Sequence, residues 1–138
     1  MARKTQRQKT DSGEAGSYAG VGREFFKAAE MAKTHEYWNA AGLLYVHGAI
    51  AMADAVAIWR EGVKSTSENH MDAIALLGEV TSDVKDRDEA LGHLQKIVRE
   101  KSRVAYTGQS FRSGDVESIG KHAGRFAGWA AKLLRSTR

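Results

Sequence analysis

The feature that most constrains the fold is a stripe of helical period along residues 37–61. Side chains recur there at steps of three and four residues, which is the spacing of one face of an α-helix. The stripe runs through Leu43, His47, Ile50, Asp54 and Ile58. Because the sequence contains no Pro, no residue in it forces such a helix to kink or stop. The segment therefore predicts one long central helix.

The same periodicity predicts four more helices, over residues 23–34, 68–80, 86–105 and 115–134. Ser67 is expected to cap the helix over 68–80, and Asp86 with Glu89 has the spacing of a capping box. We find no strand-like alternation of apolar and polar residues. The 138 residues fit one domain. We predict an all-α bundle of four to five helices over residues 21–138.

Residues 1–20 have a different composition. Tyr18 is their one large apolar side chain after Met1. So little apolar surface does not offset a backbone entropy of about 1–2 kcal/mol per residue, and we expect a disordered basic arm. The net charge of +4 divides into +2 over residues 1–20, −3 over 21–120 and +5 over 121–138. Contact with nucleic acid is therefore expected through the basic ends, and to be weak and salt-sensitive.

Composition excludes several classes of site and suggests a location. Without Cys there is no disulfide, thiolate zinc site or Cys nucleophile. The five histidines lack metal-site spacing and no Walker-type phosphate loop occurs, so we expect neither metal nor cofactor. No signal-type apolar region follows the basic first residues, and no apolar run approaches the roughly 18 residues of a membrane span. We predict a cytoplasmic protein without membrane contact.

Two polar features allow a structural or a functional interpretation. A carboxylate at Asp54 shares the central stripe with His47, and burial requires it to be paired or protonated. It belongs either to a hydrogen-bond network in the core or to the wall of a site. Residues 101–106 place Lys101, Arg103 and Tyr106 near a helix end. The cations either stabilise the helix dipole or form a phosphate pocket with Tyr106 for stacking.

Three glycines recur every four residues in the last expected helix: Gly120, Gly124 and Gly128. Each costs about 0.8–1 kcal/mol relative to Ala in a helix, so a compensating contact is expected. Close packing against another helix, in the same chain or in a second copy, is one explanation. A nucleotide-contacting surface is the other.

Four segments in order resemble the HEPN superfamily of small helical proteins. They are residues 40–50, residues 53–55, the turn 65–69 followed by His70, and residues 101–106. The resemblance implies a four-to-five-helix bundle, often a homodimer. Its members commonly act in RNA cleavage, toxin–antitoxin pairs, defence systems or nucleotide binding. A nucleotidyltransferase-type protein is a partner that the toxin–antitoxin setting implies.

Active HEPN ribonucleases use an Arg, usually followed by a polar residue, and a His four to six residues on. They cleave RNA without metal, at two centres that meet across a dimer. The corresponding residues here are Lys101 and Tyr106, and a Tyr with a pKa near 10 is a poor base at neutral pH. The resemblance thus implies a degenerate member. Arg87 and His93 match the motif formally, but their six-residue step places them about 120° apart on a helix.

Three hypotheses follow. The first is a non-catalytic domain that binds a nucleic acid, a nucleotide or a partner protein, in which Asp54 holds a cation in place and Lys101 or Arg103 meets a phosphate. The second is a metal-independent ribonuclease that uses Arg87 and His93. The third is a structural or regulatory homodimer that pairs through the glycines. The candidate binding residues are His47, Asp54, His70, Lys101, Arg103 and Tyr106.

Overall fold

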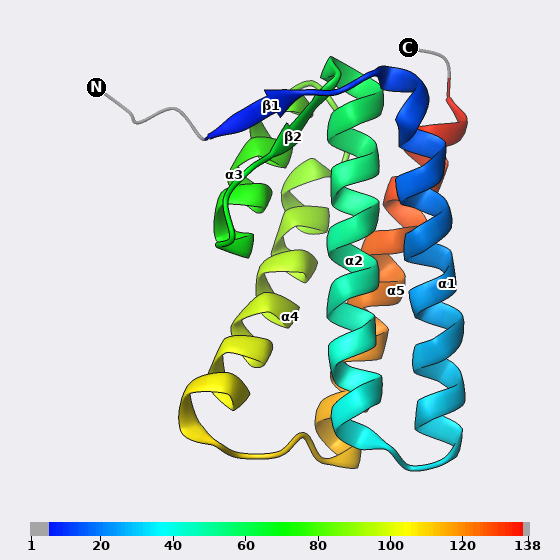
Figure 1. Cartoon of the computed structure of the whole chain (residues 1–138), viewed down its shortest axis with the longest axis vertical. Helices are drawn as coiled ribbons and strands as arrows, with labels where there is room; N and C mark the ends of the chain where they lie inside the picture. Colours follow the sequence, from blue (N-terminus) through cyan, green and yellow to red (C-terminus); the bar gives the residue numbers. More distant parts are fainter. Residues whose placement is uncertain (1–5, 137–138) are drawn as a thin grey trace.

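The described part of the chain forms a bundle of five helices with a small two-stranded sheet at one end (Figure 1). The structure is a computed structural model that describes residues 6–136, without the side chains of residues 105–107. The helices are α1 (Ala15–Thr34), α2 (Trp38–Glu61), α3 (His70–Val80), α4 (Arg87–Thr107) and α5 (Ser113–Arg135). The predicted all-α class is confirmed.

Helix α2 is the centre of the bundle, because α1, α3, α4 and α5 all pack against it. From Ala49 to Ile58 every residue except Asp54 is buried. Most of these residues are alanines, which leave room for neighbouring helices on several sides. The helix ends at Gly62, whose left-handed backbone (φ 62°) lets its N–H donate to the Ile58 carbonyl. The predicted central helix therefore agrees with the structure to within one residue at its start.

Two glycines bring α1 and α2 into close contact. A Cβ atom added at Gly22 would lie 2.9 Å from Cγ of Met52, and one at Gly48 would lie 3.2 Å from the Gly22 carbonyl oxygen. Both distances are shorter than ordinary van der Waals contact, so larger residues would push the helices apart. Tyr45 of α2 adds a polar contact, because its hydroxyl donates a hydrogen bond to Glu30 of α1.

The expectation of a disordered arm is wrong for residues 6–20. Strand β1 (Arg7–Lys9) pairs antiparallel with β2 (Val63–Ser65), a 3-10 turn spans Ser12–Glu14, and α1 already begins at Ala15. The arm gains ladder hydrogen bonds, and Arg7 forms an ion pair with Glu79 of α3 at 2.6 Å. Large apolar side chains were the wrong criterion, because small residues at a close helix contact also bury surface. Residues 1–5 lie outside the described residues.

Two predicted helix caps differ from the structure. Asn69, not Ser67, caps α3, and its side chain accepts the N–H of Met71 at 2.9 Å. Ser67 instead donates its hydroxyl to the carboxylate of Asp72 at 2.7 Å. Asp86 precedes α4 in a left-handed conformation and makes no side-chain cap, so the predicted capping box does not form.

The loop between α4 and α5 is fastened to the start of α2. Phe111 is buried there, and a Cβ atom on Gly42 would lie 2.6 Å from its ring. The backbone N–H of Phe111 donates to Asn39 Oδ1 at 2.7 Å. At the start of α5, Asp115 accepts the N–H of Arg112 at 2.8 Å. These contacts fix the lower end of α4 relative to α5 in the view of Figure 1.

Helix α2 is long and apolar enough to span a membrane, alone among helices of the described residues. The sequence analysis predicted no such segment, because it considered only uninterrupted runs of about 18 apolar residues. However, 72% of the most apolar window is buried inside the bundle. This burial is typical of the core helix of a soluble protein.

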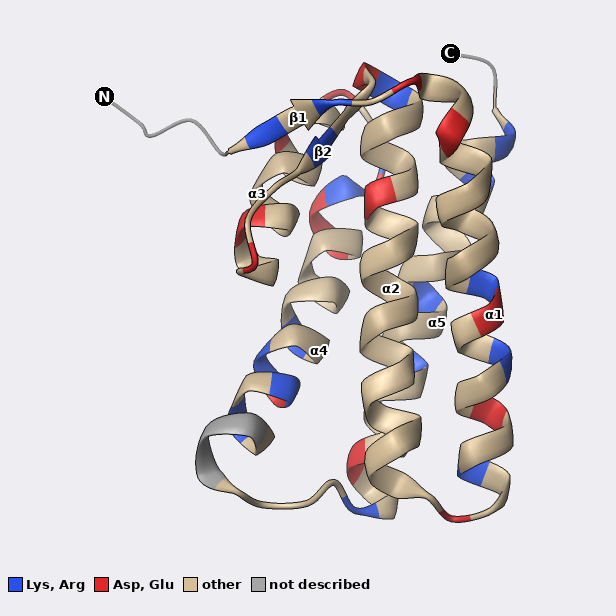
Figure 2. Cartoon of the chain, in the orientation of Figure 1, with Lys and Arg blue, Asp and Glu red and all other residues tan. Residues whose placement is uncertain are grey.

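Charges are unevenly distributed over the helices (Figure 2). Blue segments gather in the lower half of α4, whereas the visible face of α2 is mostly uncharged. The basic residues concerned are Lys96, Arg99, Lys101 and Arg103, with Glu100 among them. The bundle therefore has a basic region on α4. The charge totals did not predict this region, because residues 21–120 together have a net charge of −3.

Candidate functional site: a histidine–lysine cleft

A cleft of about 520 Å³ opens between the start of α3 and the second half of α4. We call it the α3–α4 cleft. Its size is in the range that small ligands use. Its lining combines a cation, a hydroxyl, an amide and an imidazole with apolar surface. The lining residues are Glu68, Asn69, His70, Met71, Val98, Lys101 and Ser102.

His47 of α2 lies behind this cleft. Its ring is edge-on to His70, with ring centroids 6.2 Å apart, and it is tilted against the ring of Phe25, with the centroids also 6.2 Å apart. Among the residues that the structure describes, neither imidazole has a hydrogen-bond partner. Three of the predicted site residues, His47, His70 and Lys101, are thus brought together from three helices.

Burial and charge both act on the two imidazoles. Burial lowers the pKa of His47, and the nearby Lys101 ammonium lowers it further. The pKa of His70 is lowered by burial, then by Lys101 and by His47. Both rings are therefore neutral at pH 7 and offer one N–H donor each. A bound anion would oppose the effect of Lys101 and favour their protonated forms.

The amides at the start of α3 are already in use. Asn69 accepts the N–H of Met71, and the Asn69 carbonyl accepts the N–H of Asp72 at 3.0 Å. The carboxylate of Asp72 is bound in turn by Ser67. A ligand in the cleft would consequently depend on side chains, above all on Lys101, Ser102 and His70, rather than on free amides at the helix terminus.

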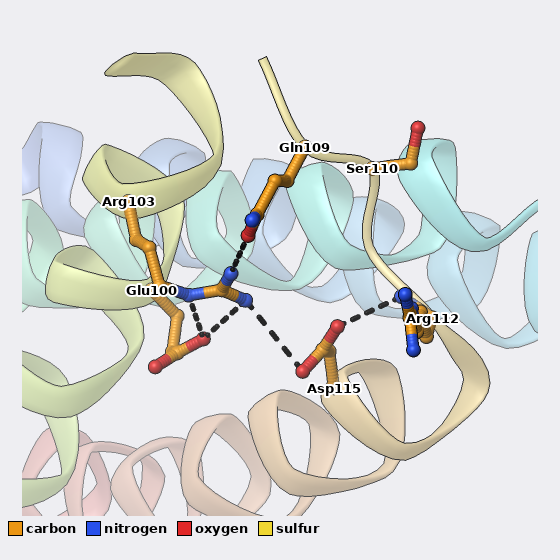
Figure 3. A pocket seen from close by; sticks show the side chains of 6 residues that line it. All are labelled: Glu100, Arg103, Gln109, Ser110, Arg112 and Asp115. Atoms are coloured by element: carbon orange, nitrogen blue, oxygen red, sulfur yellow. Dashed lines mark hydrogen bonds and ion pairs between the residues drawn. The ribbon is translucent and has the colours of Figure 1, made fainter. Parts of the chain in front are cut away.

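Arg103 faces a different hollow, of about 570 Å³, at the foot of α4 (Figure 3). Its guanidinium donates to Glu100 at 3.0 and 3.1 Å and to Gln109 at 2.7 Å. It also lies 3.6 Å from the carboxylate of Asp115. Arg112 brings a second cation to the lining, so the charges of the two arginines and two carboxylates balance. This network joins α4, the following loop and α5, which is a structural role.

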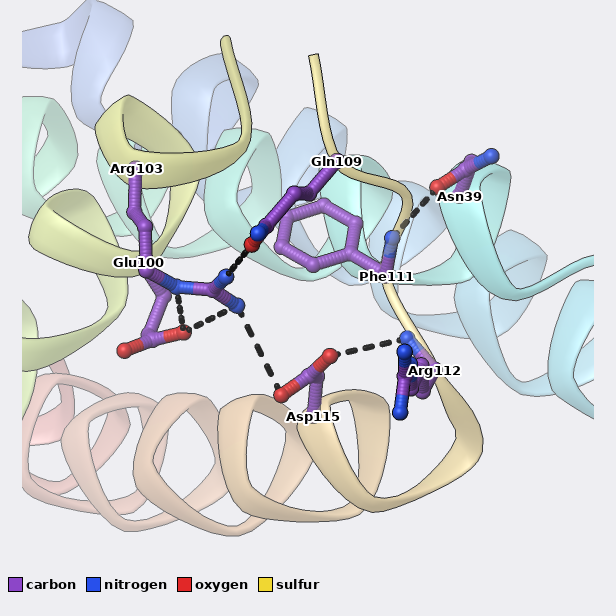
Figure 4. A network of polar contacts seen from close by, with 7 residues as sticks. All are labelled: Asn39, Glu100, Arg103, Gln109, Phe111, Arg112 and Asp115. Atoms are coloured by element: carbon purple, nitrogen blue, oxygen red, sulfur yellow. Dashed lines mark hydrogen bonds and ion pairs between the residues drawn. The ribbon is translucent and has the colours of Figure 1, made fainter. Parts of the chain in front are cut away.

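The predicted pairing of Asp54 with Arg103 in one site is wrong. Arg103 bonds to the loop whose Phe111 is tied to Asn39, at the start of α2 (Figure 4). Asp54 lies fifteen residues beyond Asn39, which is about 22 Å along the axis at 1.5 Å per residue. That separation is far beyond the reach of a salt bridge.

Asp54 instead lies near the sheet. Burial raises its pKa to about 6, and Lys64 of β2 partly offsets this effect. The Lys64 ammonium also lies 5.6 Å above the ring of Tyr18. Asp54 shares a helix face with His47 but belongs to the core beneath the sheet, not to the α3–α4 cleft. The side chain of Tyr106 lies outside the described residues.

Arg87 and His93, the alternative catalytic pair, point to different helices. Arg87 lies beside Gly78 of α3, where an added Cβ atom would be 3.6 Å from its Nη1, and its Nε lies 3.4 Å from Asp88. His93 instead reaches α5, with its Nδ1 2.9 Å from Nδ1 of His122. The pair does not form one centre within this chain, as the angle between the two positions on a helix predicts.

The three glycines of α5 have two different environments. A Cβ atom at Gly120 would lie 3.1 Å from the ring of Tyr45, so this glycine packs against α2 within the chain. It is therefore a poor candidate for an interface between copies, which corrects that expectation. Nothing in the described chain lies within 4 Å of a Cβ atom at Gly124 or Gly128. Both line a groove with Trp129.

Comparison with known proteins found no matching family model, curated protein or solved structure.

Sequence reasoning missed three elements of these sites. Ser102 and Asn69 line the cleft, and the second histidine pair, His93 with His122, joins α4 to α5. The two histidines are 29 residues apart, so no spacing rule relates them. The amphipathic pattern of α4 and α5 could have indicated that each of these two histidines lies beside the apolar face of its helix.

Proposed function

We propose that this chain is a non-catalytic, HEPN-like helical domain that binds a phosphate-bearing nucleotide in the α3–α4 cleft. The observation that carries the proposal is the meeting of His70 and Lys101, from two helices, on one concave surface, with His47 of a third helix against the ring of His70. Lys101 supplies a full positive charge, and Ser102 and His70 supply hydrogen-bond donors. Such charge-assisted bonds are the strong ones for phosphate.

The charge of the surroundings supports an anionic ligand. Lys101 is the cation that acts on both imidazoles of this site, and it raises the positive potential there. The carboxylate of Glu68 in the cleft lining lowers the positive potential. The adjacent hollow around Arg103 is less suitable for phosphate, because two carboxylates already compensate that guanidinium.

Binding is better supported than RNA cleavage. The cleft offers two neutral imidazoles, but they stack edge-on against each other and one of them lies behind the lining. The formal ribonuclease pair, Arg87 and His93, is divided between two faces of α4. Neither of these two groups therefore places a base, an acid and a phosphate cation around one reacting atom.

The test is calorimetric titration of the full chain with AMP, ADP and a short single-stranded oligouridylate at fixed low salt. We expect saturable binding of AMP and about a tenfold loss of affinity in Lys101→Ala, the lower end for a hydrogen bond to a charged group. Lys132→Ala, on α5, is the matched control and keeps wild-type affinity. Glu68→Gln should bind AMP more tightly. Equal affinity in the two lysine variants would contradict the proposal.

The oligouridylate arm separates a nucleotide site from a nucleic-acid surface. If AMP does not bind but the oligonucleotide does, with equal losses in Lys101→Ala and Lys132→Ala, binding is through general basic surface. Incubation of total RNA with the chain in EDTA tests cleavage in the same preparation. Intact RNA is expected; cleavage that His93→Ala abolishes would support the ribonuclease hypothesis instead.

A regulatory homodimer is the second candidate, favoured by the open surface at Gly124 and Gly128. Both glycines carry a helix-propensity cost that no contact in the described chain explains. A second copy of α5 seated on this groove would explain them. Light scattering of wild type and of Gly124→Leu tests the idea: we expect a dimer and a monomer, respectively. A monomeric wild type would contradict it.

The HEPN resemblance extends the proposal to a biological setting. It suggests a cytoplasmic member of a toxin–antitoxin or defence system, with a nucleotidyltransferase-type protein as partner. A gene for such an enzyme beside the gene for this chain, and co-purification of the two products, would support that setting. Co-expression that yields only the separate proteins would count against it.

A further inference from the structure

The second histidine pair joins α4 to α5 away from the proposed nucleotide site. Nδ1 of His93 and Nδ1 of His122 are 2.9 Å apart, and the ring centroids are 5.1 Å apart with a 36° angle between the planes. This is a direct hydrogen bond, so one ring donates its Nδ1–H and the other accepts through a lone pair. One Nδ1–H and one Nδ1 lone pair, on two helices, therefore meet at one point, and removal of the shared proton would leave two lone pairs there.

Two imidazoles on one metal ion need a different orientation of the same two rings. With Zn–N bonds of about 2.0–2.1 Å at a tetrahedral angle, the two nitrogens lie about 3.4 Å apart and both lone pairs converge on the metal. The observed distances, 2.9 Å between the Nδ1 atoms and 5.1 Å between the ring centroids, are those of rings that point at each other along a hydrogen bond. A metal ion would replace the shared proton, and each ring would turn by about 35–40° to aim its lone pair at the metal.

Glu89 supports a metal-binding tautomer of His93. It lies one turn earlier on α4, with its carboxylate 3.9 Å from Nε2 of His93. A small approach would let Nε2–H donate to the carboxylate, which leaves Nδ1 free as a ligand. This carboxylate–imidazole arrangement is common behind metal-bound histidines.

An open groove gives access to His93 of the pair. The groove of about 470 Å³ has two carboxylates in its lining, Asp86 and Glu89, and two cations, Arg125 and Lys132. A metal held by two imidazoles could take water molecules from it to complete its coordination. In the described chain no group of three or more His, Asp or Glu residues is placed to hold a metal, so water must supply the remaining ligands.

We infer that His93 and His122 form a binding site for one divalent transition metal of the zinc, nickel or copper class, which ties α4 to α5. Imidazole nitrogen is a preferred ligand for all three ions. The surrounding charge sets a limit on affinity, because Lys96, Lys121 and Arg125 act on His122 and oppose a cation. Glu89 and Asp86 act in the opposite sense. The site is independent of nucleotide binding.

The experiment is calorimetric titration of the metal-free full chain with zinc chloride and nickel chloride at pH 7.5. We expect one ion per chain, and at least a tenfold loss of affinity in His93→Gln and in His122→Gln, since even an outer partner of a ligand is worth about 10–100-fold. Glu89→Gln should lose less. His70→Gln, in the other pair, and His35→Gln, at an exposed histidine, are the controls and keep wild-type affinity.

Two outcomes would overturn the inference. One is no saturable one-to-one binding of zinc or nickel up to millimolar concentration. The other is an affinity that falls equally in His70→Gln and His122→Gln, which would indicate unspecific binding by histidines. Copper(II) electron paramagnetic resonance of the wild type provides a readout that does not depend on variant folding. It should show two nitrogen ligands, and a spectrum without nitrogen coupling would contradict the site.

Discussion

The two histidine pairs of this bundle contain the same side chains but differ in their hydrogen bonding. His47 and His70 are 6.2 Å apart, edge-on, and have no hydrogen-bond partner among the described residues. His93 and His122 bond directly to each other through their Nδ1 atoms. The first pair lies against a cleft that contains a lysine, whereas the second has a carboxylate one helical turn away.

The comparison shows that a histidine's neighbours decide which ligand it suits. Beside Lys101, the neutral imidazole of His70 can donate a hydrogen bond to an anion and gain a proton when the anion binds. Beside Glu89, two Nδ1 atoms that share one proton suit a metal cation that replaces this proton. Phosphate binding is therefore expected at the first pair and metal binding at the second, and substitutions can separate the two.

Reversing the charge of Lys101 should have the largest effect. Lys101→Glu replaces a charge-assisted hydrogen bond with repulsion of the phosphate, and we expect AMP affinity to fall about a hundredfold. Zinc affinity at His93 and His122 should stay unchanged, because Lys101 faces the other pair. Parallel titrations of one preparation with AMP and with zinc check both statements. A loss of zinc binding in this variant would show that the two sites are not separate.

Asp54→Asn should stabilise the protein without affecting either pair. With a pKa raised from 3.8 to about 6, the folded state penalises the charged carboxylate by about 3 kcal/mol above pH 6. Asp54 thus costs stability progressively as pH rises through 3.8–6. The variant should gain about 2–3 kcal/mol in urea unfolding at pH 8 and almost nothing at pH 3.5. A gain that is equal at both pH values would contradict the burial of this charge.

Arg103→Gln should weaken the fold rather than the binding. The change removes the guanidinium between Glu100 and Asp115, and we expect a loss of about 1 kcal/mol, because the network is partly exposed. AMP affinity should stay within about twofold of wild type, the small effect that a charge outside the cleft exerts. Chemical unfolding and calorimetry measure the two quantities. A tenfold loss of AMP affinity would return Arg103 to the binding site.

The smallest expected effect is a dependence of AMP binding on pH. An imidazolium binds phosphate better than a neutral imidazole, so affinity should rise a few-fold as pH falls from 7.5 toward about 6, where AMP begins to lose its second phosphate charge. Burial and Lys101 lower the pKa of His47 and His70 in the free chain. The lowered pKa values of the two histidines also make the fold less stable as pH falls below 6.5, because the unfolded state then binds more protons than the folded state. His70→Gln should flatten the affinity profile; an unchanged profile would exclude His70.

Local sequence signals predicted the helices well and their ends less well. The stripe from Leu43 to Ile58 predicted α2, since a buried helix needs apolar groups at steps of three and four. The strand at Arg7–Lys9 was missed, because its stability comes from pairing with Val63–Ser65, which lies far away in the sequence.

The candidate site could be predicted only in part, for a geometrical reason. His47 and Asp54 do lie on one face of α2, as predicted. They have different neighbours, however, because this face runs the whole length of the helix: His47 lies beside His70 and Asp54 beside Lys64. Arg103 was assigned to the site by its nearness to Lys101 in sequence, yet two residues along a helix turn a side chain about 200°. The pairing of His93 with His122 depends on how α4 packs against α5, which no local pattern records.

The most direct test is a titration of ¹⁵N-labelled protein followed by the imidazole resonances of its five histidines. On addition of AMP, the account predicts shifts of His47 and His70 while His93 and His122 stay in place. On subsequent addition of zinc, His93 and His122 should shift and the first pair should not. If both ligands move the same histidines, or if AMP moves His93 and His122 instead, the division of the bundle into an anion site and a cation site is wrong.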